Sequence, residues 1–111
     1  MTIHVGVLHM VLRIQGAQSL KDRRKAVVSL RDRIRSRFEV TWNEVEPFAR
    51  ADRCAVVCTT AGTEARLLRS TLDKVRHFVD QSGKAWADAV DVDVFPWHPP
   101  DALWLQEDVD G

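Results

Sequence analysis

The sequence is poor in cysteine, and this scarcity excludes the two kinds of site that cysteine usually builds. Its two cysteines are Cys54 and Cys58. In a strand that rises about 3.3 Å per residue, positions four apart lie about 13 Å from each other. That distance is too long for a disulfide, and two thiols without further ligands do not make a zinc site. We expect both thiols to be free and buried, because cysteine is among the most often buried residue types.

Long hydrophobic runs and a targeting segment are also missing. No stretch reaches the roughly 18 apolar residues that a membrane-spanning helix needs. The N-terminal residues 1–6 lack the basic-then-apolar order of a signal peptide. The chain of 111 residues is 45% hydrophobic and 29% charged, which is typical of a globular domain with one core. The sequence therefore predicts a cytoplasmic, single-domain protein.

Positive charge is absent from the end of the chain. Residues 85–111 contain seven acidic residues and no lysine or arginine. Residues 21–37, by contrast, contain six arginines and two lysines against two aspartates. The balance of 16 basic and 16 acidic residues therefore conceals a segregation of charge. One region is expected to attract phosphate or an acidic surface, and the other to repel it.

Hydrophobic periodicity predicts six elements. Strands are expected at 2–14, 38–45, 53–60 and 89–95, where Pro96 is expected to end the last strand. Apolar and polar residues alternate over 38–45, as in an edge strand, whereas residues 54–58 have no polar face, as in a central strand covered on both sides. Helical spacing predicts helices from the Ser19 cap to residue 37 and over 63–82. The stripe expected to be buried on the first helix consists of Leu20, Val27, Leu30, Ile34 and Phe38.

The order strand, helix, strand, strand, helix, strand is typical of the ferredoxin-like fold, an α+β sandwich. Right-handed crossovers place both helices on one face of a four-stranded antiparallel sheet, with the first and third strands in its centre. We assign residues 1–95 to this single domain. Residues 96–111 form an acidic C-terminal extension that contains proline, Trp97 and Trp104. This extension either folds back over the domain or binds a partner.

A family resemblance accompanies this pattern. The stretch Gly-Ala-Gln-Ser-Leu-Lys-Asp-Arg-Arg at residues 16–24 follows a first strand that begins Val-Gly-Val-Leu at residue 5. With a looser match over residues 38–45, the sequence resembles the YlxP family, known as domain of unknown function 503, across residues 3–95. The resemblance implies a bacterial ferredoxin-like protein without established enzymatic activity. Genes of this family typically lie beside those for translation initiation and ribosome maturation factors, which implies a role near RNA or the ribosome.

The basic first helix is the strongest local feature. At about 100° per residue, Arg24, Arg31 and Arg35 share one flank of the apolar stripe. A phosphate-binding surface is one interpretation, since arginine is the better phosphate partner. The other is a solvated face whose arginines pair with acidic residues elsewhere in the fold. The loop at residues 16–19 is either an anion site or a plain turn with a helix cap. We predict a nucleic-acid or anion-binding surface that consists of Lys21, Arg23, Arg24, Lys25, Arg31 and Arg35.

The sheet face opposite the helices is expected to be aliphatic. The two central strands place no aromatic side chain on it, which excludes the base-stacking mode of RNA-recognition domains. Because an aliphatic stripe does not comfortably face water, we expect it to be covered by a second copy of the chain, a partner protein or the C-terminal extension. Of these we favour a homodimer, since two-fold homodimers are common. We predict a dimer or partner face that consists of Val5, Val7, His9, Val11 and Val57.

Catalysis finds little support in the sequence. His9 is expected to pair with Asp91 or Asp93 across neighbouring strands, but no serine or cysteine nucleophile accompanies such a pair. His4 and His9 point to opposite faces of their strand and cannot share a metal. We therefore predict a non-enzymatic protein without cofactor or metal, whose partner is RNA or a ribosomal subunit. The alternative is a dimeric regulatory or scaffolding module that binds a protein or a small anionic ligand.

Overall fold

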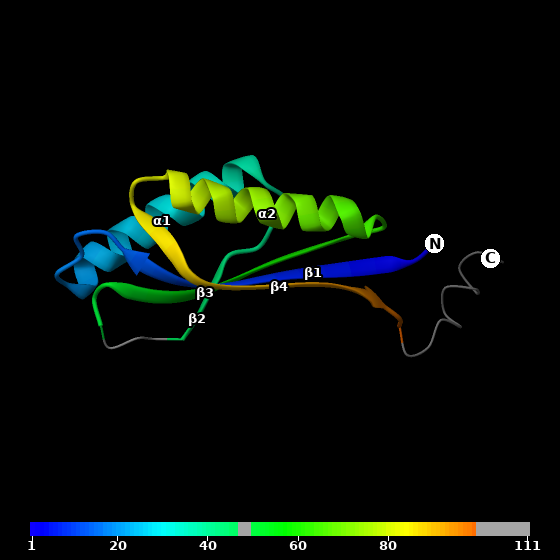
Figure 1. Ribbon diagram of the computed structural model, residues 1–111, viewed down its shortest axis with the longest axis horizontal. Helices are drawn as coiled ribbons and strands as arrows, with labels where there is room; N and C mark the ends of the chain where they lie inside the picture. Colours follow the sequence, from blue (N-terminus) through cyan, green and yellow to red (C-terminus); the bar gives the residue numbers. More distant parts are fainter. Residues whose placement is uncertain (47–49, 100–111) are drawn as a thin grey trace, which may run out of the picture.

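The elements follow one another in the predicted order. In the computed structural model, which describes residues 1–46 and 50–99, four strands form one antiparallel sheet in the order β2-β3-β1-β4. Both helices lie on the same side of the sheet (Figure 1). The α+β ferredoxin-like fold is thereby confirmed, with β1 and β3 in the centre. The bounds are β1 Ile3–Ile14, α1 Leu20–Arg37, β2 Asn43–Glu46, β3 Arg53–Gly62, α2 Ala65–Gln81 and β4 Ala85–Trp97.

The core lies between the sheet and the two helices, because each element has one apolar side. On β1 the alternating residues Leu8, Met10 and Leu12 are fully buried beneath the helices, while their neighbours along the strand point to the opposite face. On α1 the buried residues are Val27, Leu30 and Ile34, and on α2 they are Leu68, Leu72, Val75 and Val79. Leu20 is an exception to the predicted stripe. It is 56% exposed, because the first turn of α1 extends past the sheet.

The start of α1 is fixed by the cap that the sequence predicts. The hydroxyl of Ser19 accepts a hydrogen bond from the backbone N–H of Asp22 at 3.1 Å. The Asp22 carboxylate in turn accepts from the N–H of Gln18 at 3.2 Å. This reciprocal pair resembles a capping box and satisfies amides that the helix leaves without carbonyl partners. The amides of Gln18 and Asp22 are thus already bonded, which favours the turn-and-cap interpretation of this loop.

One glycine allows β1 to approach α2. A Cβ atom at Gly6 would lie 3.0 Å from Cδ1 of Leu72 and 3.3 Å from Cγ2 of Thr60. Both distances are tighter than ordinary van der Waals contact. A side chain at position 6 would therefore require the side chains of Leu72 and Thr60 to shift.

The predicted second strand is wrong over its first half. β2 begins at Asn43, and the segment before it is not part of the regular ladder. There, hydroxyl groups make bonds to β3: Thr60 Oγ1 donates to the carbonyl of Glu39 at 2.9 Å, and Thr41 Oγ1 accepts from the N–H of Thr59 at 2.9 Å. These side-chain bonds replace part of the backbone ladder, which local alternation cannot reveal.

The last strand is longer than predicted at both ends. Ala89 pairs with Val11, and Ala87 pairs with Leu12, so Asp88 is an extra, unpaired residue in a β-bulge. The bulge shifts the alternation of apolar and polar residues, so the first residues of the strand do not fit the pattern from which the strand was predicted. Pro96 does not end β4 as predicted, since an edge strand tolerates a residue without an N–H. Residues 100–111, with Trp104, lie outside the described residues.

Neither helix in the described part of the chain is long and apolar enough to cross a membrane.

Candidate nucleic-acid interface

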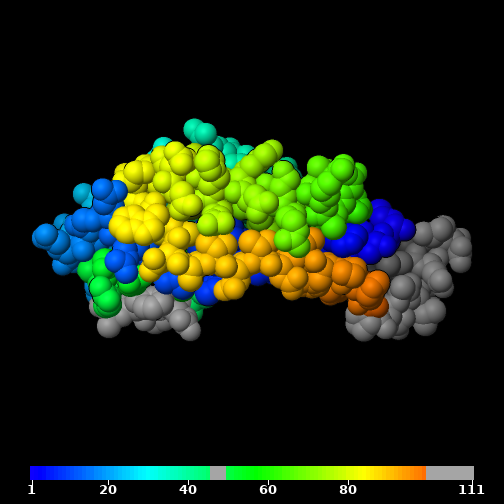
Figure 2. All heavy atoms as spheres, in the orientation of Figure 1, coloured from blue at the N-terminus to red at the C-terminus, as the bar shows by residue number. Residues whose placement is uncertain are grey.

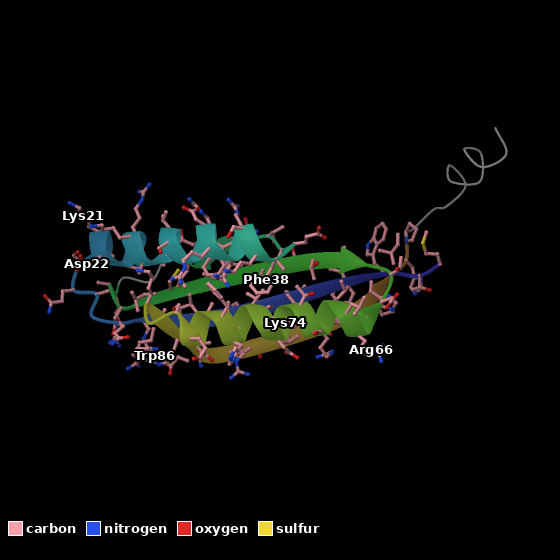
Figure 3. All side chains as sticks on the ribbon, turned by 90° about the horizontal axis from the view of Figure 1, so that it is seen from above. Lys21, Asp22, Phe38, Arg66, Lys74 and Trp86 are labelled. Atoms are coloured by element: carbon pink, nitrogen blue, oxygen red, sulfur yellow. The ribbon has the colours of Figure 1, made fainter. Side chains whose placement is uncertain are left out.

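The predicted cations of α1 gather on the side of the helix that faces β2 and on its outer surface. Viewed from above in Figure 3, charged side chains project from α1 away from α2, and Lys21 lies at the start of the helix. Arg24 and Arg31 line a groove of about 410 Å³, which Glu44 of β2 also lines. Arg35, one turn further along, lines a second hollow with the segment that precedes β2. The groove therefore combines several positive charges with one carboxylate.

Most of these cations have no ion-pair partner. Among residues 1–46 and 50–99, no carboxylate lies within 4.0 Å of the side-chain nitrogens of Lys21, Arg24, Lys25 or Arg35. Arg31 pairs with Asp32 at 3.1 Å. Asp32 follows it directly in the sequence, and such an exposed pair contributes little free energy. The alternative interpretation, in which the arginines pair with acidic residues of the fold, therefore does not apply to Arg24 or Arg35 within the described residues.

Arg23 differs from the other five predicted residues. Its side chain is half-buried, and its Nη1 donates to the carbonyls of Arg50 at 3.0 Å and Arg53 at 3.1 Å. These bonds connect the first turn of α1 to the start of β3. We therefore assign Arg23 to positioning the helix rather than to direct contact with a ligand.

Two further arginines were not included in the predicted surface. Arg33 and Arg37 lie on the opposite flank of α1, where each guanidinium is placed over the ring of Phe78 from α2. Helical spacing indicates that they lie on this flank. The aromatic ring below them comes from another element, so no local pattern in the sequence could predict this contact.

The residues predicted for the dimer or partner face lie together on the open face of the sheet, which is the face opposite the helices. Val5, Val7, Val11 and Val57 are half-buried within the described structure. His9 lies between them, and its Nδ1 is 3.4 Å from Oδ2 of Asp91, as the cross-strand prediction requires. At one end of this face, three exposed side chains extend the apolar surface: Ile3, Phe95 and Trp97. Figure 2 shows the side chains of β4 as a continuous strip beneath α2.

The other end of the open face is charged, and its two arginines share one internal carboxylate. The bulge places the Asp88 carboxylate beside two arginines: it accepts a short hydrogen bond from Arg53 and lies 3.5 Å from Nη2 of Arg13. The hydrogen bond from Arg53 lowers the pKa of Asp88 below its usual value of 3.8. These arginines are therefore occupied, which distinguishes them from the cations on α1.

The two cysteines are free and buried, as predicted. Burial raises the pKa of each thiol to about 12 from an ordinary value of 9.0. The thiol of Cys54 also donates to Oε1 of Glu44 at 3.3 Å, which raises its pKa further. Both sulfurs are protonated at neutral pH, and a protonated thiol is a poor nucleophile.

We expect neither thiol to react with Ellman's reagent in the folded protein at about pH 8, and both to react in denaturant. The raised pKa also has a consequence for stability. Between pH 9.0 and about 12 the thiols ionise only in the unfolded chain, so the free energy of unfolding should fall as the pH rises through this window. Urea denaturation at several pH values measures this fall. Rapid labelling of the native protein would contradict the burial of these thiols.

No group of three or more histidine, cysteine, aspartate or glutamate residues is placed to hold a metal ion within residues 1–46 and 50–99.

Comparison with known proteins identifies a family. The family described as "Protein of unknown function (DUF503)" matches residues 5–92. A search of curated proteins finds no significant match. Among solved structures, a conserved protein of unknown function from Bacteroides thetaiotaomicron, described as a possible oxidoreductase, is 18% identical with a TM-score of 0.39; the match covers 86% of this chain and 97% of that one. A C-terminal segment of the alpha subunit of aIF2 from Pyrococcus abyssi is 11% identical with a TM-score of 0.39; the match covers 87% of this chain and 51% of that one.

Proposed function

The chain belongs to the DUF503 family of proteins of unknown function, and we propose that this member binds RNA through α1. The observation that carries the proposal is the row of cations on α1, of which Lys21, Arg24, Lys25 and Arg35 are exposed and have no ion-pair partner in the described structure. The proposed contact residues are Lys21, Arg24, Lys25, Arg31 and Arg35. In this proposal the protein acts in the cytoplasm as a binding module without catalytic turnover.

A polyanion suits this surface for two physical reasons. Cations of equal charge on one helix repel one another, and a row of phosphates removes this repulsion while it releases condensed counterions. The guanidinium groups also match phosphate oxygens in a two-pronged geometry. Such contacts supply affinity without reading base sequence. The proposed partner is therefore an RNA recognised through its backbone, and a ribosomal subunit is the particle that the family resemblance suggests.

A small anionic ligand is the alternative occupant of the groove beside β2. The groove volume of about 410 Å³ and the presence of Arg24 and Arg31 support it. Glu44 opposes it, because its carboxylate lines the same groove and repels an anion held there. An extended backbone that lies along the outer flank of α1 stays farther from this carboxylate, which favours RNA.

We also propose that a second copy of the chain covers the open face of the sheet. Four half-buried valines and the exposed Ile3, Phe95 and Trp97 form an apolar stripe there, which Asp91 and Asp93 of β4 border. A two-fold axis in the plane of the face would bring this surface against itself, which is the commonest arrangement of soluble oligomers. Such a dimer leaves the flank with Arg24 and Arg31 on the outside of both copies, whereas Arg35 lines a hollow that it shares with Val5 of the open face.

The contact surface can be located by NMR of the arginine side chains. When a short RNA hairpin is added, the Nε–Hε signals of Arg24, Arg31 and Arg35 should shift. The signal of Arg76 should not, since Arg76 lies on α2 near Asp80, whose carboxylate accepts from Ala87 of β4. Shifts confined to residues of the open sheet face would show that RNA binds elsewhere. Shifts on addition of ATP or inorganic phosphate alone, without RNA, would favour the small-ligand alternative.

A further inference from the structure

The flank of α1 that faces α2 carries a second pair of cations. The guanidinium carbon of Arg33 is 5.2 Å from the centre of the Phe78 ring, and that of Arg37 is 4.9 Å from it. The two arginines lie one helical turn apart and are both exposed. No aspartate or glutamate in the described ranges forms an ion pair with either of them.

The ring below these arginines is itself held in place. Phe78 packs edge-on against Phe38, with ring centres 6.2 Å apart and an interplanar angle of 75°. A guanidinium over an aromatic face is attracted by the π electrons and loses part of its rotational freedom before any ligand arrives. Its N–H groups stay available because the contact uses the face of the ring. Arg33 and Arg37 are therefore pre-aligned donors.

The two sets of cations lie on opposite sides of one helix. The buried residues Val27, Leu30 and Ile34 point to the sheet. Arg24 and Arg31 lie on the β2 side of this stripe, whereas Arg33 and Arg37 lie on the α2 side. Figure 3 shows α1 and α2 side by side above the sheet, which leaves the outer surface of α1 uncovered between its two flanks. A helix with its side chains is about 10–12 Å across, so the flanks present two roughly parallel rows of positive charge.

We propose that the RNA is double-stranded and that α1 spans its minor groove, with one phosphate backbone on each flank. This inference rests on the proposed function and specifies its ligand. Arg24, Arg31 and Arg35 would contact one strand, and Arg33 and Arg37 the other. The minor groove of A-form RNA is wide and shallow, and proteins recognise it by shape and by contacts to phosphates and 2′-hydroxyls.

The composition of the sheet favours double-stranded RNA over single-stranded RNA as the ligand. Proteins that bind single-stranded RNA generally stack bases on aromatic side chains. The central strands β1 and β3 carry no phenylalanine, tyrosine or tryptophan. Phe95 and Trp97 lie on the edge strand β4, on the same side as Asp91 and Asp93, whose charges repel a nucleic acid. The described structure thus offers cations for backbones and no central platform for bases.

The test compares a blunt RNA duplex with one of its strands, by fluorescence anisotropy at about 0.1 M salt. Each phosphate contact is expected to contribute about eightfold in affinity there, because it releases about 0.9 counterion. The double variant R33A/R37A should therefore lose roughly 60-fold in affinity for the duplex and about twofold or less for the single strand. The variant F78L keeps an apolar side chain but removes the ring, and duplex affinity should fall about two- to fivefold.

The matched control is R76A, which removes an exposed arginine from the side of α2 that faces β4 and should leave both affinities unchanged. Circular dichroism confirms that each variant is folded. If R33A/R37A binds the duplex as tightly as the wild type, or if the wild type prefers the single strand, the spanning arrangement is wrong while RNA binding through α1 stands. If the wild type binds neither RNA, the proposed function fails as well.

Discussion

Replacing Arg24, Arg31 and Arg35 together with alanine is expected to weaken RNA binding by roughly 500-fold at about 0.1 M salt, since each lost phosphate contact costs about eightfold. No described carboxylate pairs with Arg24 or Arg35, and Arg31 pairs only with its exposed neighbour Asp32. Their removal therefore takes away ligand contacts and no essential bond of the fold. Titration of a labelled RNA hairpin measures the change.

The same triple variant should fold as well as the wild type. Alanine is the best helix former, and exposed substitutions usually change the free energy of unfolding by at most about 0.5 kcal/mol each. Urea denaturation checks this expectation. The single variant R76A is the control for loss of one positive charge and should bind RNA normally. An unchanged affinity in the folded triple variant would show that this flank does not contact RNA.

Placing an aspartate at Val7 is expected to dissociate the proposed dimer. Val7 lies on β1 in the open face, and a charge buried there without a partner costs about 3–5 kcal/mol. This cost corresponds to roughly two to four orders of magnitude in the dissociation constant for each charge, and a two-fold dimer buries one such charge from each copy. Sedimentation equilibrium of the wild type and V7D measures the difference. Val7 is half-buried in a single copy, so a second variant at an exposed position is needed to spare the fold. Ala61 is exposed and lies on the same face, opposite Val5. The variant A61D therefore places a charge on this face.

The control for this experiment is L67D on α2. Leu67 is also an exposed apolar residue, at 55%, but it lies in the helical layer, so the variant should remain dimeric. A wild-type protein that stays monomeric at the highest accessible concentration would contradict self-association through the sheet. RNA binding by α1 does not depend on that outcome, because the helix lies in the opposite layer.

Much of the fold follows from local patterns. The alternation around Leu8, Met10 and Leu12 reports which side of β1 is buried, because a strand can hide only one face under the helices. The cap at Ser19 is likewise a matter of neighbouring residues. The bounds of β2 and β4 were harder to predict, because contacts between residues distant in the sequence determine both. The bonds of Thr41 to β3, and the bulge that brings Asp88 to Arg13 and Arg53, depend on residues distant in the sequence.

Some features of the candidate site also follow from local patterns, whereas others depend on tertiary contacts. The grouping of Arg24, Arg31 and Arg35 on one flank follows from helical spacing alone. The role of Arg23 does not, because the carbonyls that it binds belong to the start of β3. The placement of Arg33 and Arg37 over Phe78 also required the packing of α1 beside α2. Spacing therefore predicts which cations share a flank, whereas tertiary contacts decide which of them are available.

The salt dependence of RNA affinity, measured in parallel for the wild type and for R24A/R31A/R35A, counts the phosphate contacts made by this flank. A plot of the logarithm of affinity against the logarithm of salt concentration should be steep for the wild type. For the variant its slope should be smaller by about 2.7, since each contact adds about 0.9 to the slope. Equal slopes for the two proteins would mean that Arg24, Arg31 and Arg35 do not hold the RNA backbone.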